Sequence, residues 1–104
     1  MVCLRSEHNG DDSRYLHAHF APSGDLLIEG EDSGPATALV SSDGEYEWLW
    51  VVAVDKLPEL LRVLGAGQET DVLDELEAHW SGAASYELER HLRESGLASL
   101  ERMG

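Results

Sequence analysis

The sequence predicts an α+β fold, in which a three- to four-stranded antiparallel sheet is followed by two to three helices packed on one face of the sheet. Side chains in the first half of the chain alternate between polar and apolar, and turn residues separate the alternating segments. Apolar residues in the second half recur at helical spacing. The chain has 104 residues, the size of one small domain.

Two alternating segments predict a hairpin. The first is Arg14–Ala21, and the second is Leu26–Glu31. The Pro-Ser-Gly-Asp sequence between them favours a turn, because Pro fixes φ and Gly accepts a positive φ. The two segments should therefore pair in an antiparallel manner.

The most hydrophobic stretch, Glu45–Val54, predicts a central strand. Glu45 and Glu47 share one face of this strand, and Trp48 and Trp50 share the other. Its second half is apolar on both faces, so that end should be covered on both sides. We expect the tryptophans to be core residues that meet the leucine stripe of the first helix.

The segments outside these strands carry weaker signals. Residues 1–12 contain an Asn-Gly-Asp-Asp sequence and predict a loose terminus or a weak first strand. Residues 36–40 fit either a short edge strand or an ordered loop. Residues 97–104 predict a further helical turn or a frayed tail, because apolar residues recur every third position.

Three apolar stripes predict helices. Asp55, Thr70 and Ser85 are placed to cap the first, second and third helix respectively. Gly65 and Gly96 are placed to end the first and the third. The stripes are Leu57, Leu60, Leu61 and Leu64 in the first helix, Val72, Leu73, Leu76 and Trp80 in the second, and Leu88 and Leu92 in the third.

The third helix, about Tyr86–Ser95, has the thinnest stripe, so we expect it to dock weakly. Glu89 and Arg93 are four residues apart, and they predict a surface pair worth a few tenths of a kcal/mol.

Charge limits the function classes. The chain has 21 Asp and Glu against 7 Lys and Arg, a formal net charge of −14. Such a surface repels phosphate backbones and anionic membranes, so we expect neither nucleic acid nor a membrane as a partner. It attracts basic proteins, although an acidic composition also serves solubility alone. The chain shows no transmembrane run and no signal-peptide pattern, and we expect it to be cytoplasmic.

Four carboxylates are candidates for a partner-binding surface. If the strands pair as predicted, Glu29, Glu31, Glu45 and Glu47 can share one face of the sheet. Like charges on neighbouring strands repel one another, and a basic partner would relieve this repulsion. The other interpretation is an ordinary solvated face.

His17 and His19 are candidates for metal ligands. They lie two residues apart on one predicted strand, and Glu29 or Glu31 across the hairpin could complete a divalent-metal site. The other interpretation is a pair of ordinary strand histidines beside carboxylates. The sequence contains no H-E-x-x-H, phosphate-loop, dinucleotide-binding or G-x-S-x-G motif, so we expect no catalytic residues and no cofactor.

Two motifs resemble those of a group of small, uncharacterised acidic proteins of actinomycete bacteria. The first is G-D-L-L-I-E-G-E-D-S-G-P at Gly24–Pro35, and the second is E-Y-E-W at Glu45–Trp48. By pattern, the resemblance extends over about residues 13 to 96. It implies no catalytic residue. The size and acidity of the chain are also similar in style to those of toxin-neutralising immunity proteins.

We therefore expect a non-enzymatic interaction module whose acidic surface binds a basic protein, for example as an immunity-type inhibitor. The alternative is a small-ligand or divalent-metal-binding domain. A homodimer through an exposed sheet edge is a further option.

Overall fold

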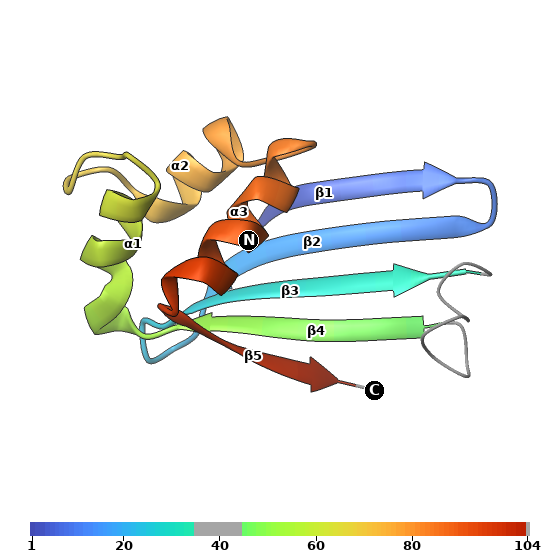
Figure 1. Cartoon of the computed structure of the whole chain (residues 1–104), viewed down its shortest axis with the longest axis horizontal. Helices are drawn as coiled ribbons and strands as arrows, with labels where there is room; N and C mark the ends of the chain where they lie inside the picture. Colours follow the sequence, from blue (N-terminus) through green and yellow to red (C-terminus); the bar gives the residue numbers. More distant parts are fainter. Residues whose placement is uncertain (35–44, 104) are drawn as a thin grey trace.

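Five antiparallel strands form one sheet in the order β1-β2-β3-β4-β5 in the computed structural model (Figure 1). The structure describes residues 1–34 and 45–103, and for Glu45, Arg102 and Met103 it describes the backbone alone. The strands are β1 Val2–Asn9, β2 Asp12–Phe20, β3 Leu26–Ser33, β4 Glu45–Val52 and β5 Ala98–Met103. Between β4 and β5 lie the 3-10 helix η2 Val54–Lys56 and the α-helices α1 Leu57–Val63, α2 Val72–His79 and α3 Ala84–Ser95. The predicted α+β class is confirmed. The sheet has five strands, whereas three to four were expected, and the fifth strand follows the helices.

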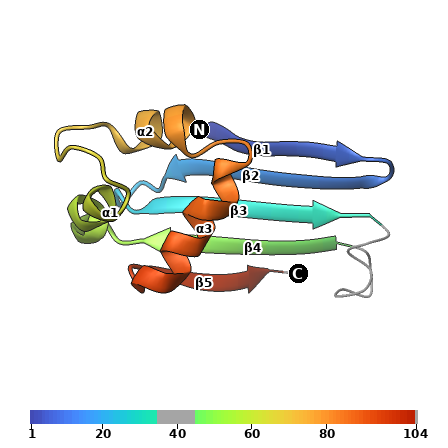
Figure 2. The same cartoon turned by 45° about the horizontal axis from the view of Figure 1, so that its top comes forward.

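The helices lie on one face of the sheet and over one end of its strands (Figures 1 and 2). Helix α3 runs across the strands, and the end of the sheet where β1 turns into β2 extends beyond the helices (Figure 2). One face of the sheet is therefore partly covered and the other is left without helices. Within the described residues, no helix is both long and apolar enough to cross a membrane.

The hydrophobic core lies between the helices and the sheet face that they cover. Strands β2, β3 and β4 contribute alternate residues to it, as period-two side-chain orientation requires, and β1 contributes Leu4. From the strands the core takes Leu4, Leu16, Ala18, Leu26, Ile28, Trp48, Trp50 and Val52, and from the helical region it takes Leu60, Leu61, Leu64, Val72, Leu76, Leu88 and Leu92. The predicted stripes of the three helices thus supply most of the helical half of the core.

Gly30 sets the position of a tryptophan on the covered face. A Cβ atom at this position would come within 2.1 Å of the indole of Trp48. Because glycine has no side chain, the indole can lie directly against the backbone of β3. This contact fixes the middle of β4 to its neighbouring strand.

Both terminal segments form strands, which was one of two predicted alternatives for the N-terminal segment and was not expected for the C-terminal one. β1 pairs with β2, and a register shift between Cys3 and Arg5 lets both Leu4 and Arg5 reach the interior. β5 pairs with β4, with Leu100 opposite Trp50, so the predicted helical turn over residues 97–104 is wrong. Pairing with a distant strand overrides the local three-residue spacing of its apolar residues. The segment 36–40, predicted as strand or loop, lies outside the described residues.

The N-terminal starts of the helices differ from the prediction, whereas the predicted C-terminal stop signals agree with the structure. Asp55 lies within η2, and α1 begins after it without a side-chain cap. Asp71, rather than Thr70, caps α2, and its Oδ1 accepts a hydrogen bond from the main-chain N–H of Asp74 at 3.0 Å. Ser85 lies inside the first turn of α3. The glycines predicted to end α1 and α3 adopt positive φ angles of 76° and 71°, which confirms both stop signals.

A buried polar network attaches α3 to the sheet. Arg5 of β1 donates to Glu89 Oε1 at 2.7 Å and, through Nε, to Ser85 Oγ at 2.9 Å. Two indole N–H groups donate to the other carboxylate oxygen of Glu89, from Trp48 at 2.9 Å and from Trp50 at 2.8 Å. One carboxylate thus joins β1, β4 and α3, and both of its oxygens are satisfied. We call these five residues the Glu89 network.

This network corrects one prediction about α3. Glu89 does not form the predicted surface pair with Arg93, because it is engaged with Arg5 inside the protein. The tryptophans are core residues as expected, at 8% exposure for Trp48 and 3% for Trp50. They belong to the same core cluster as Leu60, Leu61 and Leu64, and their indole N–H groups also donate to Glu89 of α3.

Candidate functional site: the open face of the sheet

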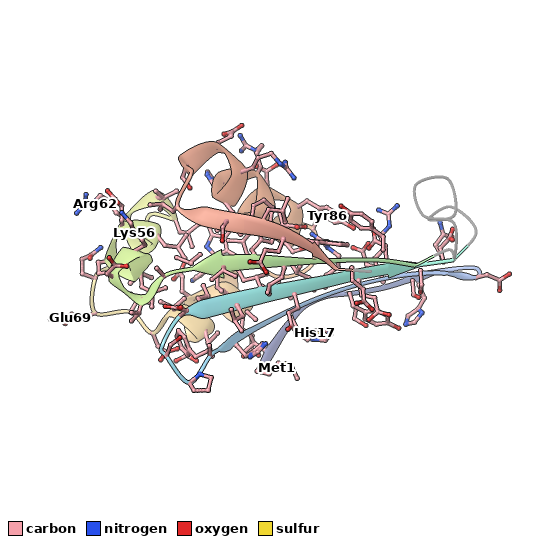
Figure 3. The ribbon with its side chains drawn as sticks, turned by 90° about the horizontal axis from the view of Figure 1, so that it is seen from below. Met1, His17, Lys56, Arg62, Glu69 and Tyr86 are labelled. Carbon is pink, nitrogen blue, oxygen red and sulfur yellow. The ribbon has the colours of Figure 1, made fainter. Side chains whose placement is uncertain are left out.

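The sheet face opposite the helices gathers most of the residues that the sequence singled out. We call it the open face, and among its residues are His17, His19, Glu29, Glu31, Glu47 and Glu101. On β2, β3 and β4 these positions alternate with buried core positions, so their side chains point away from the helices. Glu101 lies on the same face by its register position opposite Leu49. In a view along the sheet, His17 lies on the side opposite Tyr86 of α3 (Figure 3).

Strand register places the acidic side chains next to one another. Glu31 of β3 is directly opposite Glu47 of β4, and Glu29 is directly opposite His17 of β2. Directly opposed side chains in antiparallel strands have Cβ atoms about 4.5–5.5 Å apart, close enough for like charges to destabilise the pair. The predicted gathering of Glu29, Glu31 and Glu47 on one face is therefore present. For Glu45, the structure gives the register position opposite Ser33, next to this group along β4.

Among the side chains that the structure describes, no Lys or Arg compensates these carboxylates. In the described residues, no Lys or Arg forms an ion pair with Glu29, Glu31 or Glu47. By strand position or by element, the seven Lys and Arg residues all lie off the open face: Arg5 and Arg14 at helix-side positions of β1 and β2, Lys56 in η2, Arg62 in α1, Arg90 and Arg93 in α3, and Arg102 opposite Trp48 in the β4–β5 register. The charge of the protein is therefore asymmetric between the two faces of the sheet.

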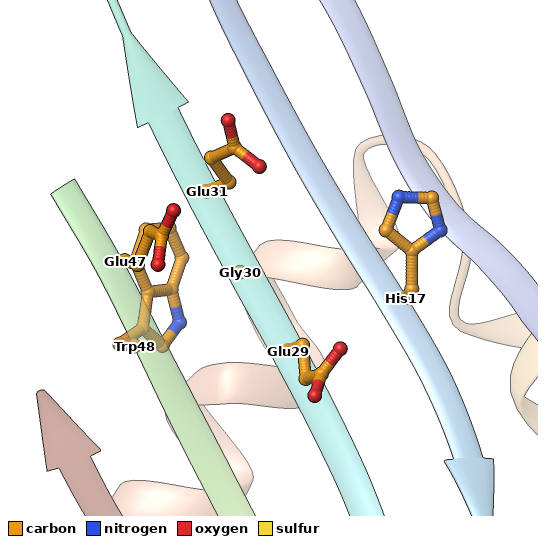
Figure 4. A pocket seen from close by; sticks show the side chains of 6 residues that line it. All are labelled: His17, Glu29, Gly30, Glu31, Glu47 and Trp48. Carbon is orange, nitrogen blue, oxygen red and sulfur yellow. The ribbon is translucent and has the colours of Figure 1, made fainter. Parts of the chain in front are cut away.

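A shallow hollow lies at the centre of the acidic residues (Figure 4). Its volume is about 230 Å³, and it is lined by His17, Glu29, Gly30, Glu31, Glu47 and Trp48. Pockets for drug-sized ligands typically enclose roughly 300–1,000 Å³. The hollow suits the end of one side chain of a partner better than a whole small molecule.

The histidines of the open face have little access to a shared metal position. His19 Nε2 lies 3.6 Å from Glu29 Oε1, and His17 is the cross-strand neighbour of the same glutamate. In the part of the chain that the structure describes, no group of three or more His, Cys, Asp or Glu side chains is arranged to hold a metal ion. The geometry thus gives no support to the metal-binding alternative.

Glu101 was missed by the sequence analysis. It lies on β5 opposite Leu49, and its exposed side chain extends the acidic surface to the edge of the sheet. Residues 97–104 were expected to be helical or frayed, so no face could be assigned to this residue. Once β5 is known to pair with β4, period-two alternation assigns it to the open face.

Comparison with protein-family models, with curated proteins and with solved structures gives no significant match.

Proposed function

We propose that this protein is a non-enzymatic interaction module of the cytoplasm that binds a basic protein through the open face of its sheet. The observation that carries this proposal is the charge asymmetry of the sheet. Glu29, Glu31, Glu47 and Glu101 share a face whose strand positions contain no Lys or Arg. Two of these glutamates are directly opposed across β3 and β4, an arrangement that costs stability in the isolated protein.

A basic partner would relieve the repulsion between the opposed glutamates, and this relief would contribute to the free energy of binding. Cationic side chains placed over the paired glutamates would relieve their repulsion and steer the encounter between the two proteins. The sheet holds the backbone of these residues at fixed spacing, so little backbone order has to be created on binding. An inhibitor of a basic toxin is the specific form of this function that we favour, because such a partner combines high positive charge with the need for tight neutralisation.

The experiment compares two variants with the same change in charge. In the first, Glu29, Glu31, Glu45 and Glu47 are all changed to Lys; in the second, four helical-region residues, Glu69, Asp74, Glu77 and Glu94, are changed to Lys. Wild type and both variants are used to capture partners from the source cell, and each captured protein is then titrated in purified form at several salt concentrations.

We expect the open-face variant to lose the partner and the helical-region variant to retain it. Binding by the wild type should weaken steeply as salt is raised, because exposed charges are screened over about 10 Å at 0.1 M salt. Equal loss of binding in both variants would mean that net charge alone drives association, and retention in the open-face variant would place the interface elsewhere.

The immunity form of the proposal has its own readout. A toxic basic partner should arrest growth when expressed alone, and co-expression of the wild-type protein should restore growth. The open-face variant should fail to restore it while remaining folded by circular dichroism. A partner that is harmless when expressed alone would rule out the immunity form and leave the binding function intact.

A further inference from the structure

A second concave site lies on the other side of the sheet, where helix α3 ends its cover of the strands. This groove has a volume of about 320 Å³. The rings of Trp48 and Tyr46 make up its floor, and the rest of its lining is Arg5, Asp32, Trp50, Tyr86, Glu89, Arg93 and Leu100. We call it the aromatic groove.

The floor of the groove is aromatic. The indole of Trp48 lies against the backbone at Gly30, and the ring of Tyr46 lies 5.4 Å from it at an interplanar angle of 37°. On the helix side, the ring of Tyr86 lies 3.7 Å from the guanidinium carbon of Arg5. The protein thus already stacks one guanidinium against an aromatic ring at the border of this groove.

Asp32 supplies an unused hydrogen-bond acceptor at the groove. Its Oδ1 is shielded from solvent and accepts no hydrogen bond within the described residues. Buried polar atoms without partners are rare in native structures, and each calls for an explanation such as a missing ligand. Rotation about the terminal torsion of an aspartate is soft, so a small turn of the carboxylate can present this oxygen to the groove.

Asp32 shares a neighbouring cation with a second carboxylate. Arg14 lies between Glu7 and Asp32 in the strand register, so one cation stands between two carboxylates. Arg5 donates through two of its nitrogens within the Glu89 network. Arg93 also lines the groove, with its guanidinium 5.8 Å from the ring of Trp50. Burial raises the pKa of the Asp32 carboxyl, and the two nearby arginines oppose this shift without cancelling it.

We propose that the aromatic groove binds a guanidinium group, such as the side chain of an arginine on a partner. A guanidinium is planar, so it stacks on aromatic faces, and its forked N–H donors match both oxygens of a carboxylate. The floor formed by Trp48 and Tyr46 meets the first requirement, and Asp32 with its free oxygen meets the second. The groove and the open-face glutamates lie on opposite faces of the sheet, so this inference and the proposed function can fail independently.

The test uses two small probes that differ in charge and have nearly the same shape. N-acetyl-arginine amide carries a guanidinium, and N-acetyl-citrulline amide carries a neutral urea of similar size. Each is titrated into ¹⁵N-labelled protein, and NMR follows the indole N–H signal of Trp50, which lines the groove and does not line the open-face hollow. Trp80 donates to Glu75 at the other end of the helical layer, and its indole signal serves as an internal reference.

We expect the arginine probe to shift the Trp50 signal in a saturable manner, and the citrulline probe to bind at least about tenfold more weakly, since hydrogen bonds to a charged donor are the stronger ones. Asp32→Asn should weaken arginine binding by a similar factor. Glu31→Gln removes the same charge from the neighbouring residue on the open face, and it should leave binding unchanged.

Three results would overturn the inference. The first is an equal response to both probes, which needs no variant and so holds even if Asp32→Asn fails to fold. The second is unchanged arginine binding in Asp32→Asn. The third is a response confined to open-face signals and abolished by Glu31→Gln, which would support the open face as the cation site and exclude the groove.

Discussion

Removal of the Glu89 carboxylate should be among the most damaging single substitutions in this protein. The side chain of Arg5 is 2% exposed and that of Glu89 is 12% exposed, so Glu89→Ala leaves a buried guanidinium without its counter-ion. Breaking a buried ion pair in this way typically costs about 3–5 kcal/mol. The same substitution removes the acceptor of two buried indole N–H groups, each of which adds to the loss.

The size of this loss can be judged against the stability of a small domain. Domains of this kind are stable by roughly 5–15 kcal/mol, so a cost of about 3–5 kcal/mol takes a large share of the total. Each kcal/mol lowers the Tm of a domain of this size by about 4 °C or more, so a fall of at least about 12 °C is expected. Urea denaturation followed by circular dichroism gives the free energy of unfolding directly.

Two controls separate this explanation from a general effect on α3. Glu87 lies on the same helix, is 56% exposed and pairs with Arg90 at the surface. Glu87→Ala should cost less than about 1 kcal/mol, as is usual for exposed ion pairs. Combining Glu89→Leu with Arg5→Met should recover part of the loss, because no buried charge is then left without a partner. The reasoning is refuted if Glu89→Ala costs no more than Glu87→Ala.

Three other substitutions test separate features of the fold. Gly30→Ala should destabilise the protein by about 1–3 kcal/mol in urea denaturation, because its Cβ would overlap the indole of Trp48. Gly67→Ala is the matched control, since a Cβ there would lie 3.5 Å from its nearest neighbour. Equal effects of the two substitutions would contradict the contact between Gly30 and Trp48. Glu47→Lys should raise the free energy of unfolding by roughly 0.2–1 kcal/mol by replacing a like-charge pair across β3 and β4, with the gain shrinking in high salt; a loss of stability would show that the pair is not repulsive. Burial raises the pKa of Asp32 above its usual value of about 3.9. The folded state therefore holds this proton more tightly than the unfolded state does. The stability that the group contributes is present at acid pH, and it falls as pH rises through the folded pKa. Asp32→Asn should therefore gain stability relative to wild type as pH rises across that range in paired urea titrations, and a difference independent of pH would count against the shift.

The sequence was informative wherever local periodicity matches the tertiary environment. β3 and β4 start where predicted, at Leu26 and Glu45, and the leucine stripe of α1 is buried as expected. Alternation within these two strands was enough to place Glu29, Glu31 and Glu47 on one face. These features depend on residues close together in the sequence, which is where single-sequence patterns are strong.

The missed features depend on contacts between distant residues. Arg5 looked like part of a polar terminus. Its guanidinium is nevertheless buried, because Glu89 of α3 neutralises it. Glu89 itself looked like half of a surface pair, since Arg93 stands at the favourable spacing. No pattern along the chain reports that two tryptophans and an arginine converge on one carboxylate. β5 was missed for the same reason, because its partner strand is separated from it by all of the helices.

The place of β5 in the chain has a consequence for how the sheet is completed. The strand is joined to α3 only by Gly96 and Leu97, and it pairs with a strand that precedes the whole helical region. Until it docks, the edge of β4 offers unpaired main-chain groups that any strand of matching register can satisfy. The β5 strand of a second molecule presents the same sequence, and swapping an identical element is a low-cost route to a dimer. The last strand is thus the element through which two copies can exchange segments while each keeps a complete sheet.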